Sequence, residues 1–291
     1  MIKEIKAKKV LTYHPNAFPT NWDLNPYRGC TIGCKYCYAQ YTHKYLDLDN
    51  FFTDILIKTN IHVCLEKEFQ NKNWKHEQIK IGGTTDLYQH IEKKYELLPK
   101  IYDVIKKHKN PIFIQTKSTL ILRDFEIIKE LSKITTVDIA TSISSFDESI
   151  RKVIEPGAAS AMERIEILSK FKGICRTTTL GFMPIIPLLS DTEENLETTF
   201  MLAKEFGINN IVTSFLFLRG EGKPKFMKIL KSNFAEIYTD FSKLYANSTV
   251  NEEHSNRIQV KIQNLRRKYD LYGIYSPVEP IEPTKQLSLF S

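Results

Sequence analysis

The sequence has few cysteines and no long apolar run, and each shortage excludes a class of protein. No window of the 291-residue chain approaches the ~18 consecutive apolar residues that a membrane-spanning helix needs. Segment 1–15 is charged and lacks the apolar core of a secretory signal peptide. Five cysteines in a chain of this length do not suit a secreted disulfide framework, which favours even counts in smaller chains. We therefore expect a soluble, cytoplasmic protein with reduced thiols.

Short β-branched or apolar runs alternate with segments whose apolar residues recur every three or four positions. The runs predict buried strands at residues 79–83, 111–117, 137–144, 174–187 and 209–218. The other segments predict amphipathic helices at residues 56–69, 95–109, 124–134, 160–173 and 192–207. With a first strand just before residue 30, this pattern predicts an α/β fold, a partial (β/α)6 barrel similar to a TIM barrel. A doubly wound sheet has the same local pattern and is the alternative.

The alternation stops after residue 218, and this divides the chain into four predicted regions. They are an N-terminal extension (1–20), the partial barrel (21–218), a basic, mainly helical C-terminal cap (219–275) and an extended tail (276–291). The cap holds eleven Lys or Arg against six Asp or Glu, in a chain whose net charge is +7. Such a region could face a polyanion.

Three of the five cysteines lie within eight positions, in the segment NPYRGCTIGCKYCYAQ (25–40). Close thiols of this kind suggest a set of metal ligands. Structural zinc normally needs four ligands in two pairs, but Cys64 and Cys175 each stand alone, and His43 is one further candidate. A zinc site, in a non-enzymatic nucleic-acid adaptor, is one alternative. No other cysteine-rich segment is present to hold a second metal cluster.

The spacing Cys-x3-Cys-x2-Cys, with an aromatic residue just before the last cysteine, resembles the radical S-adenosylmethionine (radical SAM) superfamily, whose fold is a full or partial βα barrel. The resemblance implies a 4Fe-4S cluster whose fourth iron binds SAM, and whose electron cleaves SAM to a 5′-deoxyadenosyl radical. It implies that the cluster ligands are Cys30, Cys34 and Cys37, and that further SAM contacts come from Tyr36, Gly82, Gly83 and Thr85. An electron donor such as flavodoxin or ferredoxin would then be a partner.

Longer segments resemble the spore photoproduct lyase-like branch of this superfamily, which repairs a UV-induced thymine dimer in DNA. The similarity covers about residues 20–220 and includes GGTTDLYQ, QTKSTLILRD and SISSFDESIRKVIEPGAASAMERIEIL. It implies that SAM is also held by Lys117 and by Ser142, with Ser144 as a neighbouring candidate.

One position departs from the lyase pattern. The lyases carry a cysteine, in a Cys-Thr-Ser-Asp stretch, that returns a hydrogen atom to the product. This sequence reads Gly83-Thr84-Thr85-Asp86 there, so that thiol is absent. Cys175 and Tyr88 are candidate replacement donors, and simple packing is the alternative role for both.

The end of the chain resembles a short motif with which bacterial polymerases and repair proteins bind the sliding DNA clamp. In this motif, QLSLF, three apolar side chains would fill an apolar pocket of the clamp, and Gln286 would form a hydrogen bond at the edge of that pocket. The apolar anchors are Leu287, Leu289 and Phe290. Packing of the tail against its own domain is the alternative.

These features predict a radical SAM enzyme that acts as a lyase on damaged DNA and is recruited by the sliding clamp. Basic residues of the cap are the predicted phosphate contacts: Arg257, Lys261, Arg266, Arg267 and Lys268. A radical SAM enzyme acting on RNA, a protein or a small metabolite is the second hypothesis.

Overall fold

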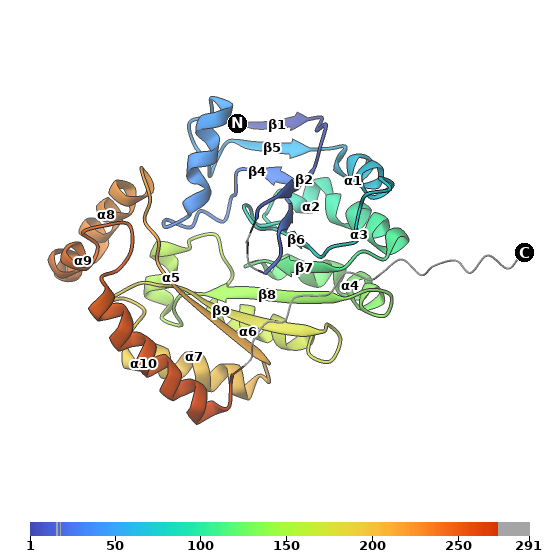
Figure 1. The fold of residues 1–291 in the computed structure, drawn as a ribbon. Helices are drawn as coiled ribbons and strands as arrows, with labels where there is room; N and C mark the ends of the chain where they lie inside the picture. The colour runs from blue at the N-terminus through green and yellow to red at the C-terminus, as the bar shows by residue number, and fades with distance from the viewer. Residues whose placement is uncertain (16, 18, 273–291) are drawn as a thin grey trace, which may run out of the picture.

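One large sheet organises the protein. The computed structural model describes residues 1–272 except residues 16 and 18 (Figure 1). The strand order in this sheet is β10-β9-β8-β7-β6-β3-β2. Its strands are β2 (Leu11–Tyr13), β3 (Trp22–Leu24), β6 (Ile79–Ile81), β7 (Ile112–Gln115), β8 (Val137–Ile143), β9 (Thr177–Ile185) and β10 (Asn210–Phe215).

Six of these strands, β3 to β10, pair in parallel and in sequence order, and β2 joins β3 antiparallel. A doubly wound sheet would reverse its strand order at a switch point, and these six strands do not. The predicted partial barrel is therefore confirmed. Every residue of β8 is buried, as expected for a central strand covered on both faces.

Helices follow the parallel strands and cover the outer face of the sheet (Figure 1). They are α1 (Ile61–Phe69), α2 (Glu92–Tyr95), α3 (Leu97–His108), α4 (Phe125–Ser132), α5 (Glu148–Ile154), α6 (Ala161–Lys170) and α7 (Glu193–Glu205). Two 3₁₀ helices lie among them, η1 (Tyr38–Leu46) and η2 (Thr119–Asp124). The apolar faces of α1, α3, α4, α6 and α7 pack into the main hydrophobic core, whereas Ile154 of α5 lies in a second apolar cluster.

A second, smaller sheet corrects one expectation. Its strands, in the order β1-β5-β4, are β1 (Ile2–Ile5), β4 (Tyr27–Arg28) and β5 (Ile55–Lys58). Residues 55–58, which overlap the helix predicted at 56–69, therefore form a strand, and the helix begins at Ile61. The N-terminal segment contributes β1 and β2, so it is part of both sheets. The sequence of β1 shows only a weak hydrophobic pattern because most of its side chains are exposed.

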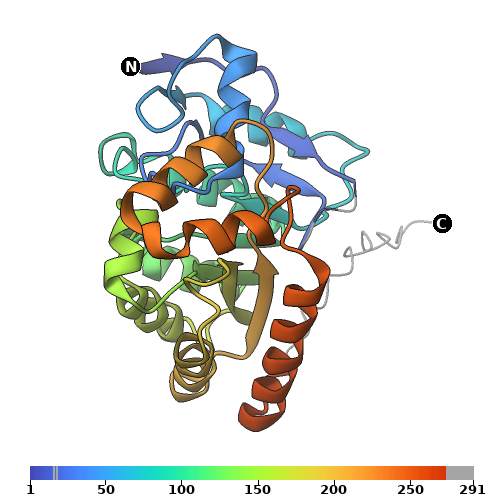
Figure 2. The same ribbon diagram turned by 90° about the vertical axis from the view of Figure 1, so that its left-hand side faces the viewer.

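After β10 the alternation of strands and helices ends, and a series of helices follows. They are α8 (Gly222–Asn233), η3 (Ala235–Ile237), α9 (Tyr238–Leu244) and α10 (Glu252–Tyr269). Helices α8 and α9 enclose the second apolar cluster, which includes Phe226, Phe241 and Leu216. Helix α10 packs beside α7 (Figures 1 and 2). Within the described chain, none of the helices has the length and apolar character needed to cross a membrane. The predicted clamp motif lies outside the described residues.

Candidate active site

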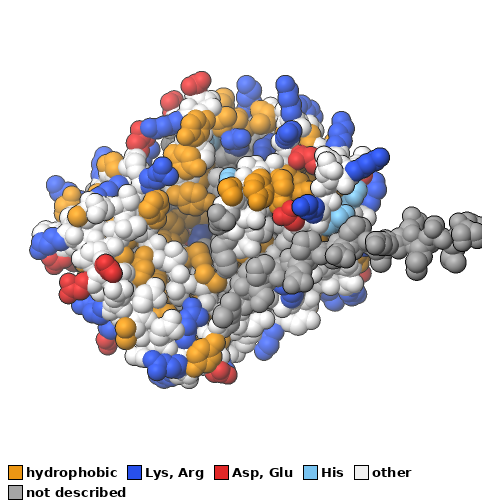
Figure 3. Space-filling view, in the orientation of Figure 1, with side chains coloured by type: hydrophobic (Ala, Val, Ile, Leu, Met, Phe, Trp, Pro, Cys, Tyr) orange, Lys and Arg blue, Asp and Glu red, His pale blue; other side chains and the backbone are white. Residues whose placement is uncertain are grey.

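The three clustered cysteines line one cavity at the carboxyl ends of the parallel strands. The cavity has a volume of about 330 Å³, and its wall includes Gly82–Asp86 after β6, Gln115 at the end of β7 with the following Thr116 and Lys117, and Ser142 of β8. The opposite side consists of Met183, Pro184 and residues 214–217. Hydrophobic side chains surround a hollow on the face seen in Figure 3. This end of a βα barrel is where active sites form.

The cysteine loop keeps its shape because glycine occupies a tight position. Gly29 has a φ of 85°, and a Cβ there would lie 2.4 Å from the Asp54 carbonyl oxygen. The loop is also tied by backbone bonds, from the Cys30 N–H to the Phe51 carbonyl (2.9 Å) and from the Lys35 N–H to the Ile154 carbonyl (2.8 Å). The sequence around the cysteines therefore holds them at the cavity.

The thiols suit a buried metal cluster better than free nucleophiles. Burial raises the pKa of Cys30 to about 12 and that of Cys37 to about 11, and it raises the pKa of Cys34 well above its usual range. Free thiols would therefore stay protonated at neutral pH, whereas iron would bind them as thiolates. Three soft sulfur donors match a 4Fe-4S cluster with one open iron.

The alternative of a zinc site finds no support in the described part of the chain. No three His, Cys, Asp or Glu side chains there are placed to hold one metal ion. Zinc would need four ligands around a single ion. Cysteines that hold a 4Fe-4S cluster bind different irons, so they need not converge on one point.

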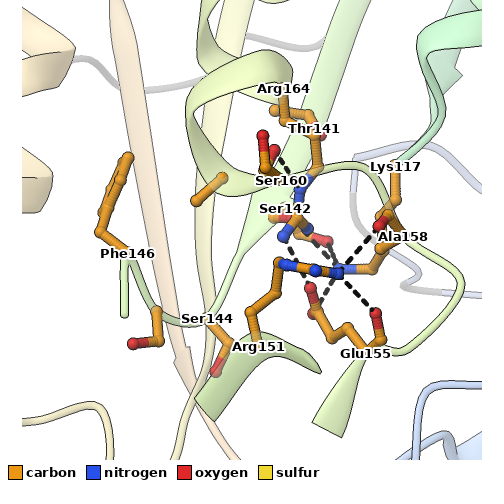
Figure 4. Close-up of polar contacts among 12 residues, drawn as sticks. Lys117, Thr141, Ser142, Ser144, Phe146, Arg151, Glu155, Ala158, Ser160 and Arg164 are labelled. Carbon is orange, nitrogen blue, oxygen red and sulfur yellow. Dashed lines mark hydrogen bonds and ion pairs between the residues drawn. The ribbon is translucent and has the colours of Figure 1, made fainter. Parts of the chain in front are cut away.

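A buried ion network joins Glu155 and Arg164 to Lys117 and Ser142 (Figure 4). The Lys117 ammonium donates to Ser142 Oγ at 2.6 Å and to Glu155 Oε1 at 2.9 Å. Arg164 Nη2 lies 2.8 Å from Glu155 Oε2, and both side chains are 1% exposed. The Tyr36 hydroxyl also donates to Glu155. Glu155 therefore connects three of the predicted SAM contacts, although the sequence analysis missed both Glu155 and Arg164.

The network carries a surplus positive charge. Burial alone would raise the pKa of Glu155, but the charges of Arg164 and Lys117 outweigh it and lower this pKa to about 2. Glu155 is therefore a carboxylate that faces two cations. Of these three groups, only Lys117 lines the cavity, where it could bind an anionic group such as the carboxylate of SAM.

Asp86 anchors the GGTTD segment to the end of β7. Its half-buried carboxylate accepts hydrogen bonds from Thr116 Oγ1 (2.6 Å) and from the N–H groups of Lys117 (2.7 Å) and Tyr88 (2.9 Å). The Asp86 N–H points at Cys30 Sγ, 3.4 Å away. Burial raises the pKa of Asp86, and the bonds from Thr116 and Lys117 oppose this rise. Such hydrogen bonds orient cluster ligands and tune a cluster's potential.

The backbone conformation at Gly82 and the close side chains at Gly83 favour glycine at both positions of this segment. Gly82 has a φ of 92°, a backbone conformation that favours glycine. A Cβ on Gly83 would lie 2.6 Å from Asp23 Oδ1 and 2.5 Å from Lys80 Cε. A side chain at the position where the lyases carry a cysteine would therefore have to displace the ends of the Asp23 and Lys80 side chains. The Tyr38 hydroxyl donates to the Gly83 carbonyl at 2.8 Å.

Replacing Gly83 with alanine is expected to lower the free energy of unfolding by about 1–3 kcal/mol, because the added methyl group must displace Asp23 or Lys80. Urea titration of anaerobically prepared protein measures this change. The matched control is Gly222→Ala, since no atom lies within 4 Å of a Cβ there. A Gly83→Ala protein as stable as the parent would show that the segment has room for a side chain.

Three predicted residues do not line the cavity. The Ser144 hydroxyl donates to the Pro184 carbonyl (2.7 Å), and the fully buried Tyr88 hydroxyl bonds Asp124 (3.0 Å). Cys175 precedes the amino end of β9, at the end of the barrel opposite the cavity, and contacts Ser132. The geometry therefore gives no support to Tyr88 or Cys175 as hydrogen donors, whereas Tyr36, Gly82, Gly83 and Thr85 do line the cavity.

The basic side chains of α10 are used within the protein. Lys261 pairs with Glu193 at 2.6 Å, and Lys268 pairs with Glu197 at 2.5 Å, so both attach α10 to α7. The remaining three also have internal partners: Arg257 bonds His254, Arg266 bonds two backbone carbonyls, and Arg267 bonds Asn264. These contacts give no support to the predicted role in phosphate binding.

Comparison with known proteins gives a family match and several similar chains. Residues 24–203 match the family model described as the radical SAM superfamily. An uncharacterized protein of Methanocaldococcus jannaschii is 30% identical over 263 residues, which cover 89% of this chain and 94% of that protein. An uncharacterized protein of Mycobacterium tuberculosis H37Rv is 29% identical over 283 residues, covering 95% of this chain and 83% of that protein.

The fold is also similar to that of a solved enzyme. Spore photoproduct lyase complexed with dinucleoside spore photoproduct superposes with a TM-score of 0.64 at 12% identity. The superposition covers 92% of this chain and 79% of the lyase. A variant of that lyase has been solved with bound AdoMet and the same dinucleoside.

Proposed function

The chain belongs to the radical SAM superfamily, whose members use a 4Fe-4S cluster and SAM, and on this premise we propose that it acts on damaged DNA to which the sliding clamp recruits it. When bound, these cofactors supply a 5′-deoxyadenosyl radical that removes a hydrogen atom from the substrate. The reaction proposed for this chain is the fragmentation or rearrangement of a modified nucleobase.

The observation that carries the enzymatic part is the network around Glu155. It joins the cysteine loop, through Tyr36, to Lys117 and Ser142, so the residues proposed for the cluster and for SAM form one rigid unit. In this proposal Cys30, Cys34 and Cys37 hold the cluster, and Lys117 and Ser142 bind the polar end of SAM.

Three features support DNA as the substrate. The GGTTD, QTK and SISSFDE segments resemble those of the lyase branch, the net charge of +7 suits a polyanion, and the QLSLF motif suits a clamp ligand. The side chains close to Gly83 support a reaction that differs from the lyase reaction in the step that returns a hydrogen atom to the product. A base within a duplex would have to leave the stack to reach the cavity.

Anaerobic reconstitution with iron, sulfide, SAM and a reductant tests the substrate. We expect 5′-deoxyadenosine together with a mass change in a lesion when UV-irradiated or otherwise damaged DNA is added. Unchanged DNA, with a mass change instead in RNA, a peptide or a small metabolite, would favour the second hypothesis and leave the family assignment intact.

The double variant Leu289→Ala/Phe290→Ala is expected to weaken binding to a purified bacterial clamp by roughly 30-fold or more, because such anchors typically dominate the binding energy. Surface plasmon resonance measures the Kd. Ser288→Ala, in the same tail but without an anchor role, is the control. Equal affinity of the double variant and the parent would refute clamp recruitment through this motif.

A further inference from the structure

Exposed aromatic residues continue outward from the cavity along η1. Tyr38 lines the cavity, while Tyr41 and Tyr45 follow on the same helix with ring centroids 6.1 Å apart. Their exposed fractions are 58%, 54% and 79%. Across the cavity, Phe217 is 47% exposed and also lines a second hollow, of about 730 Å³, between β10 and the start of α10. We call these four residues the aromatic rim.

The two chain segments that contribute the aromatic rim contain more basic than acidic residues. Residues 28–46 include Arg28, Lys35 and Lys44 and no Asp or Glu. Residues 214–231 hold one arginine and four lysines against a single acid, Glu221. The two segments meet, since Lys44 pairs with Glu221 at 2.6 Å and α8 contacts η1. The side chains of Lys225 and Lys228 on α8 are exposed.

We propose that the aromatic rim binds an unstacked, single-stranded stretch of DNA, with bases on the aromatic rings and phosphates at Lys225 and Lys228. Aromatic side chains stack on bases of any sequence, but only where the faces of the bases are free, as in a single strand. The rim begins at a cavity-lining residue, so a strand held there would pass the place where the reacting base must enter. This inference rests on the proposed action on DNA and names the form of DNA that the enzyme takes.

Fluorescence anisotropy with a labelled single-stranded oligodeoxynucleotide about 12 nucleotides long tests the rim. Tyr41→Ala/Tyr45→Ala is expected to raise the Kd roughly 25-fold, at about 5-fold for each lost ring. Tyr41→Phe/Tyr45→Phe keeps both rings and should bind as the parent does. Tyr272→Ala removes a ring of similar exposure, 55%, beyond the end of α10, and should leave the Kd unchanged.

A second variant separates phosphate contacts from stacking. Lys225→Gln/Lys228→Gln should reduce the slope of log Kd against log salt concentration by about 1.4, since each phosphate contact on a single strand contributes about 0.7. An unchanged slope would overturn the assignment of the phosphates to α8.

Other results of the binding and turnover experiments would also contradict the proposed role of the aromatic rim. Binding by the double alanine variant equal to that of the parent would overturn the rim, as would tighter binding of the parent to duplex DNA or to RNA of the same sequence. If the double alanine variant still processed damaged DNA and bound the single strand as tightly as the parent, the aromatic rim would be refuted and the proposed function would stand. A parent that binds no nucleic acid would remove the proposed function as well.

Discussion

Replacing Cys34 with alanine is expected to reduce both the iron–sulfur absorbance and the cleavage of SAM to the protein-free background. Cys34 is the middle of the three proposed ligands and is buried against the cavity. With two cysteines left, one iron would lose its protein ligand, and a buried methyl group cannot replace a thiolate. Absorbance after anaerobic reconstitution and chromatography of 5′-deoxyadenosine measure the two losses.

The matched control is Cys64→Ala, which removes a buried thiol from α1, outside the cavity. Cys64 donates to the Ala7 carbonyl at 3.2 Å and packs in the main core. This variant should keep its iron and its SAM cleavage, with a small loss of stability. Full SAM cleavage by the Cys34→Ala protein would remove the cysteine loop from the mechanism.

Glu155→Gln is expected to have the second largest effect, a loss of about 3–5 kcal/mol in the free energy of unfolding together with weaker SAM binding. Glutamine has the shape of glutamate but no charge, so Arg164 and Lys117 would lose their common counter-charge. Leaving buried cations without their anion typically costs this much. Urea unfolding and equilibrium dialysis with labelled SAM measure the two effects.

An exposed ion pair provides the control for this variant. Glu193 pairs with Lys261, but its side chain is 84% exposed, so Glu193→Gln should cost less than about 1 kcal/mol. Equal stability losses in the two variants would show that the network around Glu155 has no special role.

The stability that Glu155 contributes should also depend on pH. Its pKa is lowered in the folded protein from the ordinary 4.5 to about 2, so the contribution is complete above pH 4.5 and declines as the pH falls toward 2. The difference in stability between the parent and Glu155→Gln should therefore shrink over this range. A difference that stays constant there would contradict the assigned charge.

Local patterns were sufficient for much of the fold. The β-branched runs and the three- to four-residue periodicity placed the strands from β6 to β10 and the helices between them. These parallel strands are buried over much of their length, whereas a helix that covers the sheet is buried on one side only. Short strands with exposed side chains, such as β1, have no such pattern. Their partners lie more than fifty residues away, as in the pairing of Ile2 with Ile55, so pairing rather than composition defines them.

The sequence alone determined the cysteine spacing, the family resemblance and the strand ends that could converge, since these depend on residues near one another in the chain. Tertiary structure decided which side chains meet. Glu155 lies 38 positions from Lys117 and 119 from Tyr36, and no local pattern reveals that its carboxylate joins them. In the same way, folding pairs Lys261 and Lys268 of α10 with acids of α7, and leaves the tyrosines of η1 exposed beside the cavity. Packing between remote segments determines which groups a charged side chain or an aromatic ring contacts, and these contacts cannot be read from the order of residues in the chain.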